Sequence, residues 1–151
     1  MLIRTALTDD LPAMDKIFRQ SAQGDQLALH KLPHYIAARG RSFVQIQADQ
    51  IVGFIVLSQI EHSIVALYVL PQWQGRGIGT TLLEHGMHYL AQLGAKTITL
   101  RCHQHRSATA FYRQRGWSQG ISQNRQHWQY RLADSVPYGA RRSTSHPCAV
   151  R

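Results

Sequence analysis

Cysteine and glutamate are both scarce in this sequence. Cys102 and Cys148 are the only cysteines among 151 residues, too few for a disulfide scaffold, so we expect two free thiols. Glu61 and Glu84 are the only glutamates, which leaves a short list for any chemistry that needs a carboxylate base. No apolar run approaches the roughly 18 residues of a membrane span, and the first residues lack the pattern of a signal peptide. These absences predict a soluble, cytoplasmic protein.

Acidic residues are missing altogether from residues 85–133. The same span carries Lys96 and six arginines, whereas residues 1–84 balance seven basic against seven acidic side chains. The formal net charge of +9 therefore favours an anionic ligand or partner. Nucleic acid is one such partner, but no recognition motif accompanies the charge, so nucleic-acid binding is the weaker interpretation.

The length and the 44% hydrophobic content leave room for one substantial core. The spacing of apolar residues predicts strands over residues 2–6, 42–47, 51–60, 63–70 and 96–102, and a closing hairpin of 117–121 with 127–132. It predicts helices from a cap at Thr8 or Asp9 to about residue 24, over 78–93 and over 107–115, with a weaker helical stretch at 26–39. The fold class is therefore α/β or α+β, with six to seven strands in one mixed, mostly antiparallel sheet and about four helices. Residues 133–151 lack periodicity and are expected to form a mobile tail.

Two of these elements have a more specific pattern. Residues 51–57 are nearly all apolar, so this strand is expected to be central and covered on both faces. In the helix over 78–93, one face carries apolar residues and is expected to be buried: Leu82, Leu83, Met87, Leu90 and Leu93.

Three alternating glycines lie between a predicted strand and a predicted helix. Residues 74–79 read Gln-Gly-Arg-Gly-Ile-Gly, and glycines let successive backbone N–H groups and the helix N-terminus face a pyrophosphate. Arg76 adds a positive charge, although the same turn could be only a tight corner. No Gly-Lys-Ser/Thr of a P-loop follows, and no acidic residue about 20 positions on matches a dinucleotide fold, so both are disfavoured.

Two spaced segments resemble the GNAT superfamily of N-acetyltransferases. Residues 74–79 are similar to the family's Gln/Arg-x-x-Gly-x-Gly/Ala acetyl-CoA loop, and residues 108–117 to its Ala-x-x-Phe-Tyr-x-x-x-Gly-Phe segment. The resemblance covers residues 1–132 and implies a single domain of that family, with acetyl-CoA as co-substrate. It also implies that the strand before the loop and the strand after the helix splay apart, with acetyl-CoA in the gap between them.

The resemblance implies roles for individual residues. The backbone of Leu67 and Val69 would hold the pantetheine, and the loop would hold the pyrophosphate through Gln74, Gly75, Arg76, Gly77, Ile78, Gly79 and Thr80. Tyr112 would protonate the departing thiolate, which suits a phenol with a pKa near 10. His105 stands where the family often has an Asn that contacts the cofactor.

The base is less clear from the sequence. An amine must lose a proton before it attacks a thioester. Several family members use a Glu at the position that Ser63 matches, and Glu61, two residues earlier, is expected on the same strand face. A water relay without a dedicated base is the alternative. His103 and His105 have the spacing of a metal-binding pair, but no third ligand is evident, so no metal is expected.

The charge of the sequence limits the choice of acceptor. Residues 20–42, the region that selects the acceptor in this family, are more basic than acidic. This favours a small primary amine with its own carboxylate, or a protein N-terminus, over a polyamine. A non-catalytic module that binds CoA or acyl-CoA is the alternative function, and free sheet edges allow a homodimer.

Overall fold

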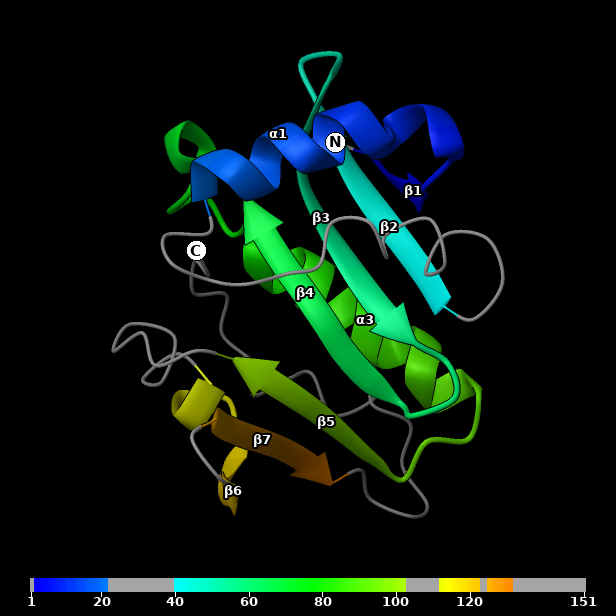
Figure 1. Ribbon diagram of the computed structural model, residues 1–151, viewed down its shortest axis with the longest axis vertical. Helices are drawn as coiled ribbons and strands as arrows, with labels where there is room; N and C mark the ends of the chain where they lie inside the picture. The colour runs from blue at the N-terminus through cyan, green and yellow to red at the C-terminus, as the bar shows by residue number, and fades with distance from the viewer. Residues whose placement is uncertain (1, 22–39, 103–111, 123–124, 132–151) are drawn as a thin grey trace.

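The computed structural model describes residues 2–21, 40–102, 112–122 and 125–131. In this part of the chain seven strands form one sheet in the order β1-β2-β3-β4-β5-β7-β6 (Figure 1). The strands are β1 (Leu2–Thr5), β2 (Gly40–Gln47), β3 (Gln50–Ser58), β4 (Ser63–Val69), β5 (Thr97–Cys102), β6 (Ser118–Ser122) and β7 (Arg125–Arg131). Among them β4 and β5 run parallel, and the other neighbours are antiparallel. The class is α+β, and each predicted strand end lies within two residues of the observed one.

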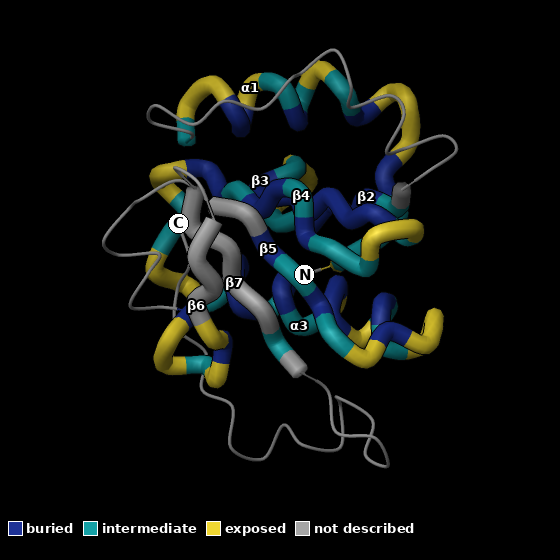
Figure 2. The backbone as a smooth tube through the Cα atoms, turned by 60° about the horizontal axis from the view of Figure 1, so that its bottom comes forward, coloured by how far each residue is buried: buried dark blue, intermediate teal, exposed yellow. Residues whose placement is uncertain are grey.

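Helices cover both faces of the sheet. The helix α1 (Leu11–Ser21) lies on one face and α3 (Ile78–Gln92) on the other (Figures 1 and 2). One buried cluster lies on the α1 side, where Met14, Ile17 and Phe18 meet the sheet, and a larger one lies on the α3 side. Every residue of β3 from Val52 to Ser58 is buried, which confirms the prediction of a central, covered strand.

The apolar face of α3 is buried with one exception. Leu82, Leu83, Met87 and Leu90 are at most 2% exposed, as predicted. Leu93 is 45% exposed, so its placement in the core was wrong. The helix ends at Gln92, so Leu93 is its C-cap and lies outside the regular helical spacing, and Gly94 follows with a left-handed φ of +92°.

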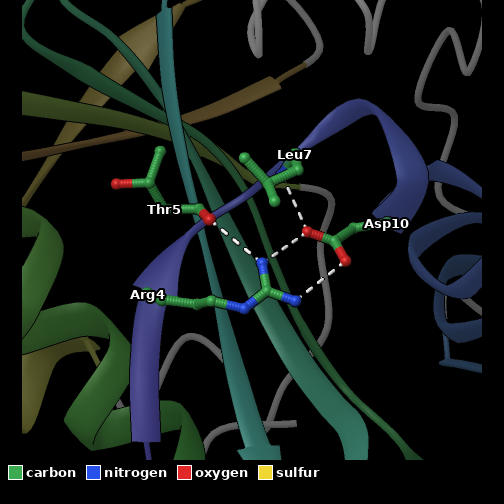
Figure 3. Close-up of polar contacts among 4 residues, drawn as sticks. All are labelled: Arg4, Thr5, Leu7 and Asp10. Atoms are coloured by element: carbon green, nitrogen blue, oxygen red, sulfur yellow. Dashed lines mark hydrogen bonds and ion pairs between the residues drawn. The ribbon is translucent and has the colours of Figure 1, made fainter.

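The turn between β1 and α1 is organised by Asp10 rather than by the predicted caps Thr8 or Asp9. A one-turn 3-10 helix (Thr8–Asp10) precedes α1, and the Asp10 carboxylate accepts the Leu7 N–H at 2.7 Å. Arg4 on β1 donates to both Asp10 oxygens, at 2.7 and 3.0 Å (Figure 3). The Arg4 hydrogen bond holds the pKa of Asp10 below its usual value, although burial opposes the shift. Sequence reasoning missed this pair because neighbouring polar residues offered equally good caps.

We expect Asp10→Asn to lower the free energy of unfolding at pH 7 by about 1–2 kcal/mol, because a partly buried charge-assisted pair is lost. The lowered pKa means that this stabilisation is present above the unfolded-state pKa, near 3.9, and is lost as pH falls through the folded-state value. Urea unfolding between pH 7 and pH 2 measures both effects. Asp15→Asn, which within the described part of the chain removes an exposed ion pair with Arg19, is the control and should cost less than about 0.5 kcal/mol. Equal losses in the two variants would contradict the assignment.

Candidate active site

The strands β4 and β5 are paired over a short distance and then diverge. Parallel pairing joins Ser63 to Thr99 and Ile64 to Leu100, and no further residue of β4 is paired with β5 in the described part of the chain. On its other side β4 remains paired with β3 as far as Val69. Figure 1 shows the two strands separating beyond their paired end. The splayed strands that the family resemblance implied are therefore present.

A bulge in β4 lies where β5 departs. Val56 is opposite Ala66 and Leu57 is opposite Ile64, so Val65 is an extra residue in β4. Val65 and Ala66 both pack toward the α1-side cluster, which interrupts the alternation of faces along the strand. The sequence did not reveal the bulge because the residues around it are apolar on both faces.

Beyond the bulge, backbone groups of β4 face the side that β5 has left. The Leu70 N–H donates to the Val52 carbonyl at 2.8 Å, so Leu70 turns toward β3. Successive residues of a strand turn their backbone groups to opposite edges, so Leu67 and Val69 turn theirs away from β3. This orientation is the one required for their predicted contacts with pantetheine.

The glycine loop follows β4 directly. A one-turn 3-10 helix (Pro71–Trp73) leads to Gly75 and Gly77, whose φ angles of +80° and +82° are left-handed, the region that glycine tolerates. α3 begins at Ile78 without a side-chain cap, and its first turn is closed by Thr81, which donates to the Gly77 carbonyl from its N–H and its hydroxyl. Because first-turn N–H groups have no acceptor inside a helix, this end of α3 suits an anion.

Arg76 lies over an aromatic ring at the loop. Its guanidinium carbon is 4.7 Å from the centre of the Trp73 ring, and Trp73 packs against both core clusters. No described carboxylate forms an ion pair with Arg76. The loop therefore presents a positive charge on a support that the core holds in place, and sequence reasoning missed Trp73.

The side chain of Gln74 forms a hydrogen bond within the protein. Its amide donates to the Val69 carbonyl at 3.1 Å, which ties the start of the loop to the end of β4. The predicted loop residues Gly75 to Thr80 follow this anchor in one continuous segment. Within that segment Ile78 and Thr80 are each 3% exposed, so their side chains are core and their backbone is what they can offer a ligand.

Tyr112 lies on the α3 side of the sheet. It is 4% exposed, belongs to the α3-side cluster and meets the Trp117 ring edge-on, with ring centres 5.7 Å apart. Its backbone carbonyl accepts the Arg115 and Trp117 N–H groups, which fixes the turn after it. His103 and His105 lie outside the described residues.

Glu61 is exposed in the turn between β3 and β4. Its N–H donates to the Ser58 hydroxyl at 3.2 Å, and His62, with a φ of +52°, separates it from the start of β4. The expectation that Glu61 shares a strand face with Ser63 was therefore wrong, because strand alternation does not extend into a turn.

Two absences concern the described residues. No three of their His, Cys, Asp or Glu side chains are grouped closely enough to bind a metal ion. Within the same residues, no helix combines the length and the apolar character needed to cross a membrane.

Comparison with known proteins identifies the family. The family model described as the acetyltransferase (GNAT) family matches residues 5–117. The structure is similar to the PaiA N-acetyltransferase of Thermoplasma acidophilum solved with coenzyme A, with a TM-score of 0.73 and 19% identity over 87% of this chain and 100% of that one. For the ribosomal-protein-S18-alanine N-acetyltransferase of Escherichia coli the values are 0.73 and 18%, over 89% and 97%.

A third similar structure, the ribosomal-protein-alanine N-acetyltransferase of Brucella melitensis, has a TM-score of 0.70 and 20% identity over 87% of this chain and 100% of that one. No curated protein matches the sequence. At these identities the structures show the fold, and the family model, which spans most of the chain, shows the family. The chain belongs to the GNAT family of acetyltransferases and is an acyltransferase.

Proposed function

We propose that this protein transfers the acetyl group of acetyl-CoA to a primary amine by direct attack within a ternary complex. The divergence of β4 and β5 at Val65 carries the proposal, because it leaves one backbone edge of β4 without a strand partner just before the glycine loop. An extended chain with amide groups, such as pantetheine, can pair with such an edge as an added strand would.

The donor is held along β4 and at the loop. The backbone of Leu67 and Val69 binds the pantetheine, and the N–H groups between Gly75 and Thr80 bind the pyrophosphate with Arg76 beside it. His105 is proposed to contact the donor in place of the family's Asn. The complex of the Thermoplasma acidophilum relative with coenzyme A supports a donor of this class.

The chemistry requires the nitrogen to lose two protons and the sulfur to gain one. The neutral amine attacks the thioester carbonyl, the C–S bond breaks, and the sulfur leaves as a thiolate. Tyr112 donates its phenolic proton to that thiolate, which avoids expelling a free anion, and the resulting phenolate takes the second proton of the nitrogen as the amide forms. The ammonium proton leaves earlier, through water to Glu61, because Glu61 is exposed in the turn that precedes β4 and does not lie on the strand itself.

The proposed acceptor is a protein N-terminus or a small amine with its own carboxylate. The net charge of +9 and the small number of acidic residues disfavour polycationic acceptors. Two of the similar structures are named for acetylating an alanine of a ribosomal protein, which supports the N-terminal option. A panel of N-terminal peptides and amino acids, with the products analysed by mass spectrometry, separates the two options.

The left-handed backbone at Gly77 makes the donor site sensitive to an added side chain there. Gly77→Ala places a side chain at a φ of +82°, where strain of about 1–2 kcal/mol displaces the loop, although nothing lies within 4 Å of the added Cβ. We expect about 5- to 30-fold weaker acetyl-CoA binding by calorimetry. Gly94→Ala is a matched control, because Gly94 has a φ of +92° and equally open surroundings at the other end of α3. Both variants should lose similar stability, and equal loss of affinity in both would sink the proposed donor site.

Tyr112 is the proposed acid that protonates the thiolate. Tyr112→Phe should lower kcat by about 100-fold and leave the Kd of acetyl-CoA unchanged, because the ring packing against Trp117 is kept. Tyr130→Phe, in the same aromatic group with its ring 5.5 Å from Trp117, should retain activity. Normal turnover by the Tyr112 variant in a steady-state assay would show that another group protonates the thiolate.

Glu61 is the proposed base that receives the ammonium proton through water. Glu61→Gln should lower kcat/KM for the acceptor by roughly tenfold at pH 7, with a smaller loss at high pH, where more of the amine is already neutral. Glu84→Gln on α3 controls for the loss of one negative charge. If both variants match the wild-type pH profile, water accepts the proton without Glu61.

A further inference from the structure

A single backbone oxygen at the end of β4 accepts two side-chain hydrogen bonds. The Val69 carbonyl receives the Ser21 hydroxyl at 2.9 Å and the Gln74 amide at 3.1 Å. Ser21 is the last residue of α1, 48 positions away in sequence, and Gln74 opens the glycine loop. The ends of three elements therefore meet at one atom.

This oxygen lies on the edge of β4 that faces the diverging strand. Leu70 turns its N–H to β3, so Val69 turns its own backbone groups to the opposite side, where β5 would otherwise pair. Val69 is fully buried, so a carbonyl there without a donor would cost free energy. A carbonyl oxygen has two lone pairs, and the two side chains engage both.

We propose that Ser21 is a positioning residue for the acetyl-CoA site. Together with Gln74 it satisfies the Val69 carbonyl, so the donor substrate binds this residue through its N–H group. It also fixes the end of α1, where the region that selects the acceptor begins, against the loop that binds the donor. This inference rests on the proposed function and assigns a role to a residue outside the loop and outside the aromatic segment.

The first consequence concerns affinity. Without the Ser21 hydroxyl, Gln74 alone holds the carbonyl, and a smaller fraction of the molecules has the end of β4 and the loop arranged for binding. The apparent Kd rises by the reciprocal of that fraction. We expect about fivefold weaker acetyl-CoA binding by Ser21→Ala, a raised KM for acetyl-CoA and little change in kcat, since the reacting groups remain.

Calorimetric titration of four full-length proteins with acetyl-CoA tests this. Wild type and Ser21→Thr, which keeps the donor hydroxyl, should bind alike, whereas Ser21→Ala should bind more weakly. Arg19→Ala is the control on the same helix, because among the described residues Arg19 makes an exposed ion pair with Asp15 and no contact with the Val69 carbonyl. A merely structural role for Ser21 would lower the melting temperature of Ser21→Ala and leave its Kd at 20 °C unchanged, which would overturn the proposal.

A double-mutant cycle with Gln74→Ala makes the test specific to the shared oxygen. Removing both donors leaves the Val69 carbonyl without a side-chain partner, so the loss of affinity should exceed the product of the single losses. The cycle of Arg19→Ala with Gln74→Ala should be multiplicative. If Ser21→Ala does not fold, Ser21→Cys, whose thiol is a weaker donor of similar size, must show an intermediate Kd. Failure of the wild type itself to bind acetyl-CoA would instead refute the proposed function, and equal Kd values for all Ser21 variants would refute only the positioning role.

Discussion

The end of pairing between β4 and β5 is the constraint on which the rest of the site depends. Two residue pairs join these strands, and the bulge at Val65 follows at once. Backbone groups beyond that point have lost a neighbouring strand, yet they lie against a buried core and need partners. At the far end two side chains meet this need on the Val69 carbonyl. Along the remainder of the edge, the proposed donor takes the place of a strand.

Side-chain packing holds the two diverging strands in a fixed arrangement. The α3-side cluster includes Leu67 and Val69 of β4 and Ile98 and Leu100 of β5, so one core extends under both strands. Close approach of α3 to the sheet depends on Gly86, where a Cβ would lie 2.8 Å from the Ile55 Cδ1 atom. The separation is therefore a property of the packed core, and a ligand need not create it. Binding to a site that is already formed costs less conformational entropy, because the protein does not have to be ordered around the ligand.

Sequence patterns predicted the elements that repeat and missed the contacts that do not. Periodicity located the strands and α3, and the glycine spacing located a loop whose left-handed φ angles require glycine. Periodicity could not show the bulge at Val65, since apolar residues occupy both faces there. It misplaced Leu93 and Glu61. Leu93 lies just after the last residue of α3 and Glu61 just before the first residue of β4, where helical or strand spacing does not apply. The contact between Ser21 and Val69 joins residues 48 positions apart, and a serine at a helix end carries no sign of such a partner.

The charge of the chain gives the proposed reaction a physical rationale on the acceptor side as well. The arrangement of Arg76 over Trp73 and the uncapped start of α3 both favour phosphate. The net charge of +9 also acts on a bound acceptor amine, because like charges disfavour its protonated form and lower its pKa. An amine whose pKa is lowered in this way holds its proton less tightly and needs a weaker base. A site with net positive surroundings can therefore work with Glu61 reached through water, and a carboxylate in contact with the amine would bring back the attraction that keeps it protonated.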